Sequence, residues 1–266
     1  DPSNQLCAAV WAVPPGRAAS IESQVDTVEF LELLKTGRPV LLDGGMGTML
    51  QARGLPVGAA PETAALEHPE WLREIHSAYL DAGSQIVYAN TFGANREKLA
   101  HCGRTVAEVV PAAVSVAREA ARGRGLVALD VGPIGQLLEP TGTLEFEQAV
   151  DIFAEVVEAG AAAGANLIAI ETMTDLQEAR AALLAAREHS SLPVLVTMTY
   201  EATGRTFLGC SPACAALTLE GLGADAIGGN CSLGPREMPP LVRELTRWST
   251  LPIAIKPNAG PWWRSF

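Results

Sequence analysis

The chain has 266 residues, 48% of them hydrophobic and 18% charged, which suits a large folded domain and excludes a wholly disordered chain. Its 19 Lys and Arg face 30 Asp and Glu, giving a net charge of −11, so the basic surface that nucleic acid or an anionic membrane requires is excluded. No apolar run approaches the roughly 18 residues that span a bilayer, and we expect no secretory signal.

Residues 1–24 are rich in Pro, Ala and Gly without a clear period, and we expect them to form a poorly ordered leader. Residues 25–266 then form one domain. It opens with an amphipathic helix over residues 25–34, in which Val28, Leu31 and Leu34 recur at helical spacing.

Strand-like apolar runs then alternate with helical segments. The predicted strands are 40–43, 85–90, 126–130, 167–171, 194–200, 226–230 and 253–256. The predicted helices are 70–82, 106–121, 146–163, 176–187, 212–222 and 235–248. Alternation of this kind implies parallel strands joined by right-handed crossovers. Seven such units favour an α/β fold of the (β/α)₈ TIM-barrel class over an open sheet.

Nearly every predicted strand ends in a polar residue or a glycine turn. Six of these ends begin at Asp43, Asn90, Asp130, Glu171, Asn230 and Lys256. Active sites of barrels lie at the carboxyl ends of the strands, so these residues are predicted to converge at one mouth. The alternative is that polar residues simply terminate apolar runs.

Two of these ends have distinctive chemistry. The glycine turn 43–48 allows backbone N–H groups to approach a ligand closely, but it has neither dinucleotide-binding nor P-loop spacing. It therefore indicates a site for a small carboxylate, or only a tight turn. Cys231 directly follows a strand and is flanked by glycines, which favours a nucleophile or a metal ligand over a buried small side chain.

Several motifs together resemble the homocysteine S-methyltransferase family, from about residue 39 to residue 260. The motifs begin with residues 42–51 and continue with Asn90-Thr91-Phe92-Gly93-Ala94-Asn95, Asp130-Val131-Gly132-Pro133, Glu171-Thr172-Met173, Gly229-Asn230-Cys231-Ser232 and Lys256-Pro257-Asn258-Ala259-Gly260. The chain is most similar to the homocysteine-binding module of the cobalamin-dependent members. The resemblance implies a (β/α)₈ barrel and methyl transfer to homocysteine.

The resemblance also implies roles for individual residues. Cys231 matches the first of three zinc-binding thiolates, and Asp43 and Glu171 match the carboxylates that hold the homocysteine ammonium group. The carboxylate of homocysteine is expected at the backbone of Gly44, Gly45, Met46, Gly47 and Thr48, with Asn258 beside it. Zinc lowers the pKa of the substrate thiol, and the thiolate then attacks a methyl group. The expected donor is methylcobalamin on a separate module, and corrinoid or folate modules are the expected partners.

The chain departs from the family in its last residues. The family's other two zinc ligands, a Cys-Cys pair after an eighth strand, are absent, and residues 261–266 no longer resemble it. We therefore expect a barrel truncated after its seventh strand, with two open sheet edges that a second chain could occupy. A catalytically incompetent fragment that binds a partner is the main alternative function.

Other residues offer further alternatives. Cys210 and Cys214, spaced i, i+4, could join Cys231 around zinc, or be small apolar fillers. Lys256 could form the Schiff base of an aldolase or lyase. The cysteines form no regular disulfide framework, which favours a reducing cytoplasm. The four histidines are expected to be structural.

Overall fold

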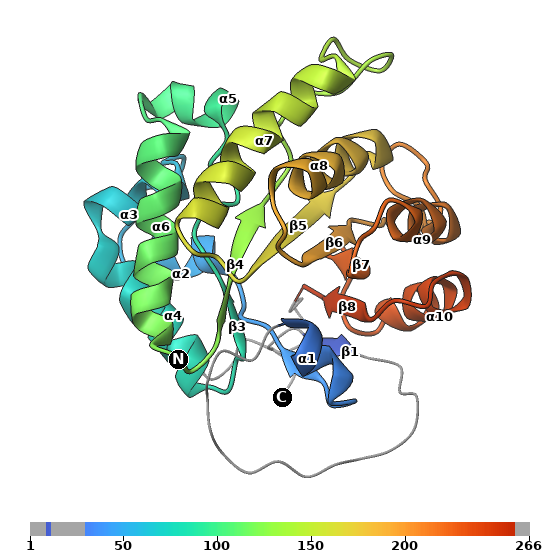
Figure 1. The fold of residues 1–266 in the computed structure, drawn as a ribbon, viewed down its shortest axis with the longest axis horizontal. Coiled ribbons are helices and arrows are strands. Elements are labelled where there is room, and N and C mark those ends of the chain that lie inside the picture. The colour runs from blue at the N-terminus through green and yellow to red at the C-terminus, as the bar shows by residue number, and fades with distance from the viewer. Residues whose placement is uncertain (1–8, 12–29, 259–266) are drawn as a thin grey trace.

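The computed structural model describes residues 9–11 and 30–258 (Figure 1). Most of the predicted leader lies outside these residues, as does the first half of the predicted helix 25–34. The described remainder of that helix is α1 (Phe30–Lys35).

The seven predicted strands are confirmed, with small changes at their ends. They are β2 (Val40–Leu41), β3 (Ile86–Tyr88), β4 (Leu126–Val131), β5 (Leu167–Met173), β6 (Val194–Met198), β7 (Ala226–Asn230) and β8 (Ile253–Lys256). From β3 to β8 each strand pairs in parallel with the next one along the chain. Most of their residues are buried, as expected of parallel strands covered on both faces.

Six long helices cover the outside of the sheet, again as predicted (Figure 1). They are α4 (Pro69–Asp81), α6 (Val106–Ala121), α7 (Phe146–Ala162), α8 (Leu176–His189), α9 (Pro212–Gly221) and α10 (Met238–Trp248). Side-chain caps fix several starts: Asp175 accepts a hydrogen bond from the Gln177 N–H of α8 and Ser211 accepts one from the Cys214 N–H of α9. None of the helices within residues 30–258 has the length and hydropathy needed to cross a bilayer.

Five short helical segments, all in loops that follow strands, are not predicted by the sequence pattern. They are α2 (Met46–Ala52), η2 (Pro61–Thr63), α3 (Ala64–Glu67), α5 (Arg96–Leu99) and η3 (Ala100–Cys102). Each has two turns or fewer, too short for a helical period to appear in the sequence.

The strand β1 (Ala9–Trp11) lies between β2 and β8 and runs antiparallel to both. Its Ala9 pairs with Leu41 of β2 and with Ile255 of β8. The expectation that these two edges are open to a second chain is therefore wrong. Residues 9–11 carry no strand pattern, because three residues are too few to show one.

The ring is completed between β2 and β3. Leu42 and Ile86 form a parallel bridge, and the Asp43 N–H donates to the Ile86 carbonyl oxygen at 3.0 Å. The strands thus curl into a barrel, as the sequence predicts.

Two apolar layers fill the fold. One lies between the sheet and the helices, and the other fills the barrel interior with small and medium side chains such as Ala128, Ala169 and Ala254. Phe30 and Leu34 of α1 belong to the inner layer and cover its lower end, where the strands begin. The polar site consequently lies at the opposite end.

Candidate active site

The barrel interior changes from apolar to polar toward the carboxyl ends of the strands. Ala128, Ala169 and Ala254 belong to the inner apolar layer. Side chains alternate between the two faces of a strand, so residues two positions further along point to the same side. These residues are Asp130 of β4, Glu171 of β5 and Lys256 of β8.

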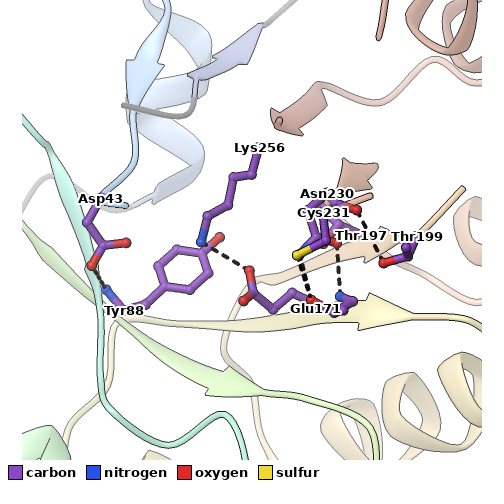
Figure 2. Close-up of polar contacts among 9 residues, drawn as sticks. Asp43, Tyr88, Glu171, Thr197, Thr199, Asn230, Cys231 and Lys256 are labelled. Carbon is purple, nitrogen blue, oxygen red and sulfur yellow. Dashed lines mark hydrogen bonds and ion pairs between the residues drawn. The ribbon is translucent and has the colours of Figure 1, made fainter. Parts of the chain in front are cut away.

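Lys256 is the cation of this group. Its Nζ lies 3.1 Å from Glu171 Oε2 and 3.7 Å from the centroid of the Tyr88 ring (Figure 2). Burial lowers the pKa of Lys256, but Glu171 and the neighbouring acids outweigh burial and hold this pKa well above its ordinary value. A Schiff-base lysine requires a lowered pKa, so these surroundings oppose the aldolase alternative.

Asp43 follows β2 and is almost fully buried. Its Oδ2 accepts a hydrogen bond from the Tyr88 N–H at 2.7 Å, whereas its Oδ1 has no hydrogen-bond partner among the described residues (Figure 2). Burial raises the pKa of Asp43 to about 7, against the lowering effect of Lys256. This carboxyl group therefore exchanges its proton near neutral pH and has one acceptor atom free.

Asp130 is the third carboxyl group at this end of the barrel. Its backbone is fixed by Thr91, whose Oγ1 accepts from the Asp130 N–H at 3.0 Å and donates to the Asp130 carbonyl oxygen at 2.8 Å. Burial, then the charge of Glu171, raises the pKa of Asp130 well above its ordinary value. The sequence motif containing Asp130 carried no predicted role for it.

Cys231 directly follows β7. Its Sγ lies 3.6 Å from Thr172 Oγ1 and 3.6 Å from Asn230 Nδ2 (Figure 2). The Asn230 Oδ1 in turn accepts from the Thr172 N–H at 2.9 Å and from Thr197 Oγ1 at 3.0 Å. Burial raises the pKa of the Cys231 thiol, so these surroundings by themselves favour the protonated form.

The backbone around Cys231 is strained. Thr172, Cys231 and Ser232 have φ angles of 62°, 57° and 59°, in the left-handed region that residues other than glycine rarely adopt. The Asn230 side chain holds Thr172, and the Cys231 N–H donates to the Lys256 carbonyl oxygen at 3.1 Å. Strained residues from two strands thus meet at one place, as is common at functional sites.

The glycine turn lies at the same end of the barrel, between Asp43 and α2. A Cβ on Gly44 would lie 2.9 Å from Tyr79 Oη, and this hydroxyl donates to the Gly45 carbonyl oxygen at 3.1 Å. The first N–H groups of a helix have no partner within the helix and favour an anion. The local structure is therefore compatible with the predicted carboxylate site at residues 44–48.

Asn258 is exposed after β8, and its N–H donates to the Leu233 carbonyl oxygen at 2.9 Å. This bond places Asn258 beside the loop that contains Cys231. Asp43, Glu171, Cys231 and Asn258, predicted from the sequence, thus lie at one end of the barrel.

Cys210 and Cys214 do not complete a zinc site. Cys210 packs against the outer apolar layer, and burial together with the neighbouring Cys214 thiol raises the pKa of Cys210 to about 12. Within residues 9–11 and 30–258, no group of three or more His, Cys, Asp and Glu side chains could hold a metal ion. Cys7 lies outside the described residues.

The histidines with described contacts are structural. His76 is fully buried in α4, where burial lowers its pKa to about 4. His68 stacks on Trp71 with ring centroids 3.8 Å apart, and His189 Nδ1 lies 2.6 Å from Glu158 Oε1.

Two buried acids that the sequence analysis missed support the loops of the mouth. Glu62 Oε1 accepts from the Gly93 N–H at 2.7 Å, and Glu178 Oε1 accepts from the Ile134 N–H at 2.7 Å. Both contacts join positions more than thirty residues apart, and no local pattern indicates them. Asp130 was predicted at the mouth because it ends a strand, and the period-two pattern that runs through Leu126 and Ala128 also points its side chain into the barrel.

Comparison with known proteins identifies relatives of this chain. A family model described as homocysteine S-methyltransferase matches residues 40–264. The methionine synthase of Mycobacterium tuberculosis is 32% identical over 242 residues, and that of Mycobacterium leprae is 31% identical over 261 residues. The alignments cover 84% and 91% of this chain but only 20% and 21% of those proteins. The chain thus spans about a fifth of the length of these curated relatives.

Solved structures show the same fold. The metallated form of the homocysteine methyltransferase MmuM from Escherichia coli has a TM-score of 0.75 and 24% identity, covering 85% of this chain and 88% of that chain. The apo form of the same enzyme has a TM-score of 0.67 and 26% identity, covering 84% and 85% of the two chains.

Proposed function

Because the chain belongs to the homocysteine S-methyltransferase family, we propose that the carboxyl end of its barrel binds homocysteine and presents the homocysteine sulfur to a methyl donor. The observation that carries this proposal is the meeting of Asp43, Glu171 and Cys231 with the glycine turn at one end of the barrel. An α-amino acid has one cationic and one anionic group, and this end offers a partner for each.

In the proposed complex, Asp43 and Glu171 face the ammonium group of homocysteine. The backbone N–H groups of residues 44–48 bind its carboxylate, and Asn258 lies beside them. These contacts orient the side chain so that its sulfur lies near Cys231. In the transfer step a sulfur–carbon bond forms, the bond from the methyl group to its donor breaks, and the thiol proton is released to solvent. The product is methionine.

We propose a methylated corrinoid carried by a separate module as the donor. The support is the similarity to two methionine synthases of which this chain matches about a fifth. The remaining length of those relatives is ample for a donor-binding module. A cytoplasmic location remains a prediction from the cysteine content.

Zinc requires more ligands than the described residues supply. Zinc sites use three or four protein ligands, and here Cys231 has a threonine hydroxyl and an amide as its closest polar neighbours. The described residues alone do not fit the metal. If Cys231 is one zinc ligand, the other ligands must therefore come from outside residues 9–11 and 30–258. Elemental analysis checks this role: if Cys231 binds zinc with ligands from outside these residues, the purified chain contains zinc and Cys231→Ser does not, whereas a chain without zinc would remove the metal role of Cys231.

Homocysteine binding tests the proposed function directly. Glu171→Gln removes the carboxylate charge at the ammonium position, and we expect it to weaken homocysteine binding about tenfold or more in calorimetric titrations. Glu147→Gln, on the exposed face of α7, is the matched control and should bind like the unchanged chain. Equal affinity in Glu171→Gln would remove Glu171 from the site. A chain that binds homocysteine but transfers no methyl group would favour the non-catalytic alternative.

A further inference from the structure

Asp130 has a buried carboxyl group to which the family resemblance assigns no role. It follows Leu126 and Ala128 on the inner face of β4, and only 7% of its surface is exposed. Thr91 holds its backbone N–H and carbonyl, so the position of the residue is fixed independently of the carboxyl group. The carboxyl group is therefore presented to the barrel interior without serving the local backbone.

Two buried acceptor atoms at this end of the barrel have no hydrogen-bond partner among the described residues. They are Oδ1 of Asp43 and Oδ1 of Asp130. Buried polar atoms of native proteins are nearly always paired, because leaving one unpaired costs about 1–3 kcal/mol. Asp43 follows β2 and Asp130 lies on β4, the strands on either side of β3, and the charge of Asp43 raises the pKa of Asp130. Such a pair indicates a ligand that donates hydrogen bonds to both.

The charges at this end indicate the sign of that ligand. Asp43, Asp130 and Glu171 lie near Lys256, the cation whose charge lowers the pKa of both aspartates. The Lys256 ammonium is already engaged by Glu171 at 3.1 Å and by the Tyr88 ring. One further cation that donates hydrogen bonds would satisfy both free oxygen atoms and offset the excess negative charge.

We propose that Asp130 binds the ammonium group of the substrate together with Asp43, and thereby selects an α-amino acid over the same thiol acid without its amino group. This inference rests on the proposed function and adds a third carboxylate to the ammonium site. Lys256 keeps Glu171 in place, while the two aspartates supply the acceptor atoms that are still free.

A protonated, purely structural Asp130 is the competing explanation. It predicts that the neutral isostere Asp130→Asn binds every ligand as the unchanged chain does. Direct contact with the ammonium group predicts a loss confined to ligands that carry this group. The two explanations therefore differ in selectivity.

The experiment compares two ligands by calorimetric titration of the full chain: L-homocysteine, and 4-sulfanylbutanoate, which lacks only the amino group. In Asp130→Asn we expect the affinity for L-homocysteine to fall about tenfold to a hundredfold, and that for 4-sulfanylbutanoate to change less than about twofold. Asp151→Asn, on the exposed face of α7, is the matched control and should leave both affinities unchanged.

Unchanged homocysteine affinity, or an equal loss for both ligands, would overturn the inference. Thermal unfolding shows whether Asp130→Asn folds, and Asp130→Ser is compared in the same way if it does not. If Asp43→Asn weakens homocysteine binding and the Asp130 variants do not, only this inference fails. If the unchanged chain binds neither ligand, both the proposed function and this inference fail.

Discussion

Buried carboxyl groups bind protons more tightly than exposed ones, and this property governs the site at the residue scale. One carboxylate oxygen of Asp43 accepts a hydrogen bond from the Tyr88 N–H, and the other has no hydrogen-bond partner among the described residues. Burial raises the pKa of Asp43 to about 7. In the absence of a cationic ligand, about half of the molecules carry a proton on Asp43 at neutral pH. An arriving ammonium group favours the ionised form, so binding and proton release are coupled.

This coupling predicts a pH dependence of homocysteine binding. Asp43 attracts the ammonium group only when it is ionised, so affinity should rise with pH until Asp43 is fully ionised. Between pH 8 and pH 6 we expect an approximately tenfold loss of affinity, because a pKa near 7 makes the protonated form dominant at pH 6. Titrations in two buffers of different ionisation enthalpy measure the released proton. Asp43→Asn should bind more weakly and lose most of this dependence; a constant affinity in the unchanged chain would contradict the assignment.

The same pKa also has a consequence for stability. The folded chain binds the Asp43 proton more tightly than the unfolded chain does between pH 4 and pH 7. Ionising Asp43 therefore reduces the free energy of unfolding as the pH rises through this range. His76 acts in the opposite direction: burial lowers its pKa to about 4, and its contribution is lost as the pH falls from 6.5 to 4. The two contributions oppose each other over most of the same interval.

At the scale of the elements, sequence patterns predict the buried strands and the long helices. Seven apolar runs and six helical periods were sufficient to identify the parallel strands and the outer helices. Asp43, Glu171 and Cys231 could be placed at one end because each follows a strand. The sequence could not predict the left-handed backbone of Thr172 or the contacts of Glu62 and Glu178. These features depend on residues that only the tertiary fold brings together.

The close approach of β7 and β8 provides an element-scale prediction. A Cβ on Gly228 would lie 1.8 Å from the Ala254 carbonyl oxygen, which is backbone and cannot turn aside. Gly228→Ala should therefore force the two strands apart and lower the free energy of unfolding by about 3 kcal/mol or more. Gly221→Ala is the control, because a Cβ there meets nothing within 4 Å and alanine favours the helix. Urea unfolding measures the free energy of unfolding of both variants. Equal values would mean that β7 and β8 need not lie this close.

At the scale of the whole molecule, seven parallel strands are completed by one antiparallel strand from the N-terminal segment. The strand β1 pairs with the edges of β2 and β8. Asp43 follows β2, and Lys256 ends β8. The arrangement of the two charged groups across the mouth consequently depends on pairing by a three-residue strand.

This dependence predicts the behaviour of Val10→Pro. Val10 pairs with Val40 on one side and Ala254 on the other, and proline removes the backbone N–H and disrupts such central pairing. The exposed edges of β2 and β8 should then pair with other copies of the chain. We expect a lower melting temperature and a larger mass in light scattering coupled to size-exclusion chromatography. Val10→Thr keeps the N–H and a β-branched side chain and should behave like the unchanged chain. If Val10→Pro has the same melting temperature and the same mass as the unchanged chain, β1 does not hold the barrel closed. The parallel strands alone must then maintain the geometry across the mouth.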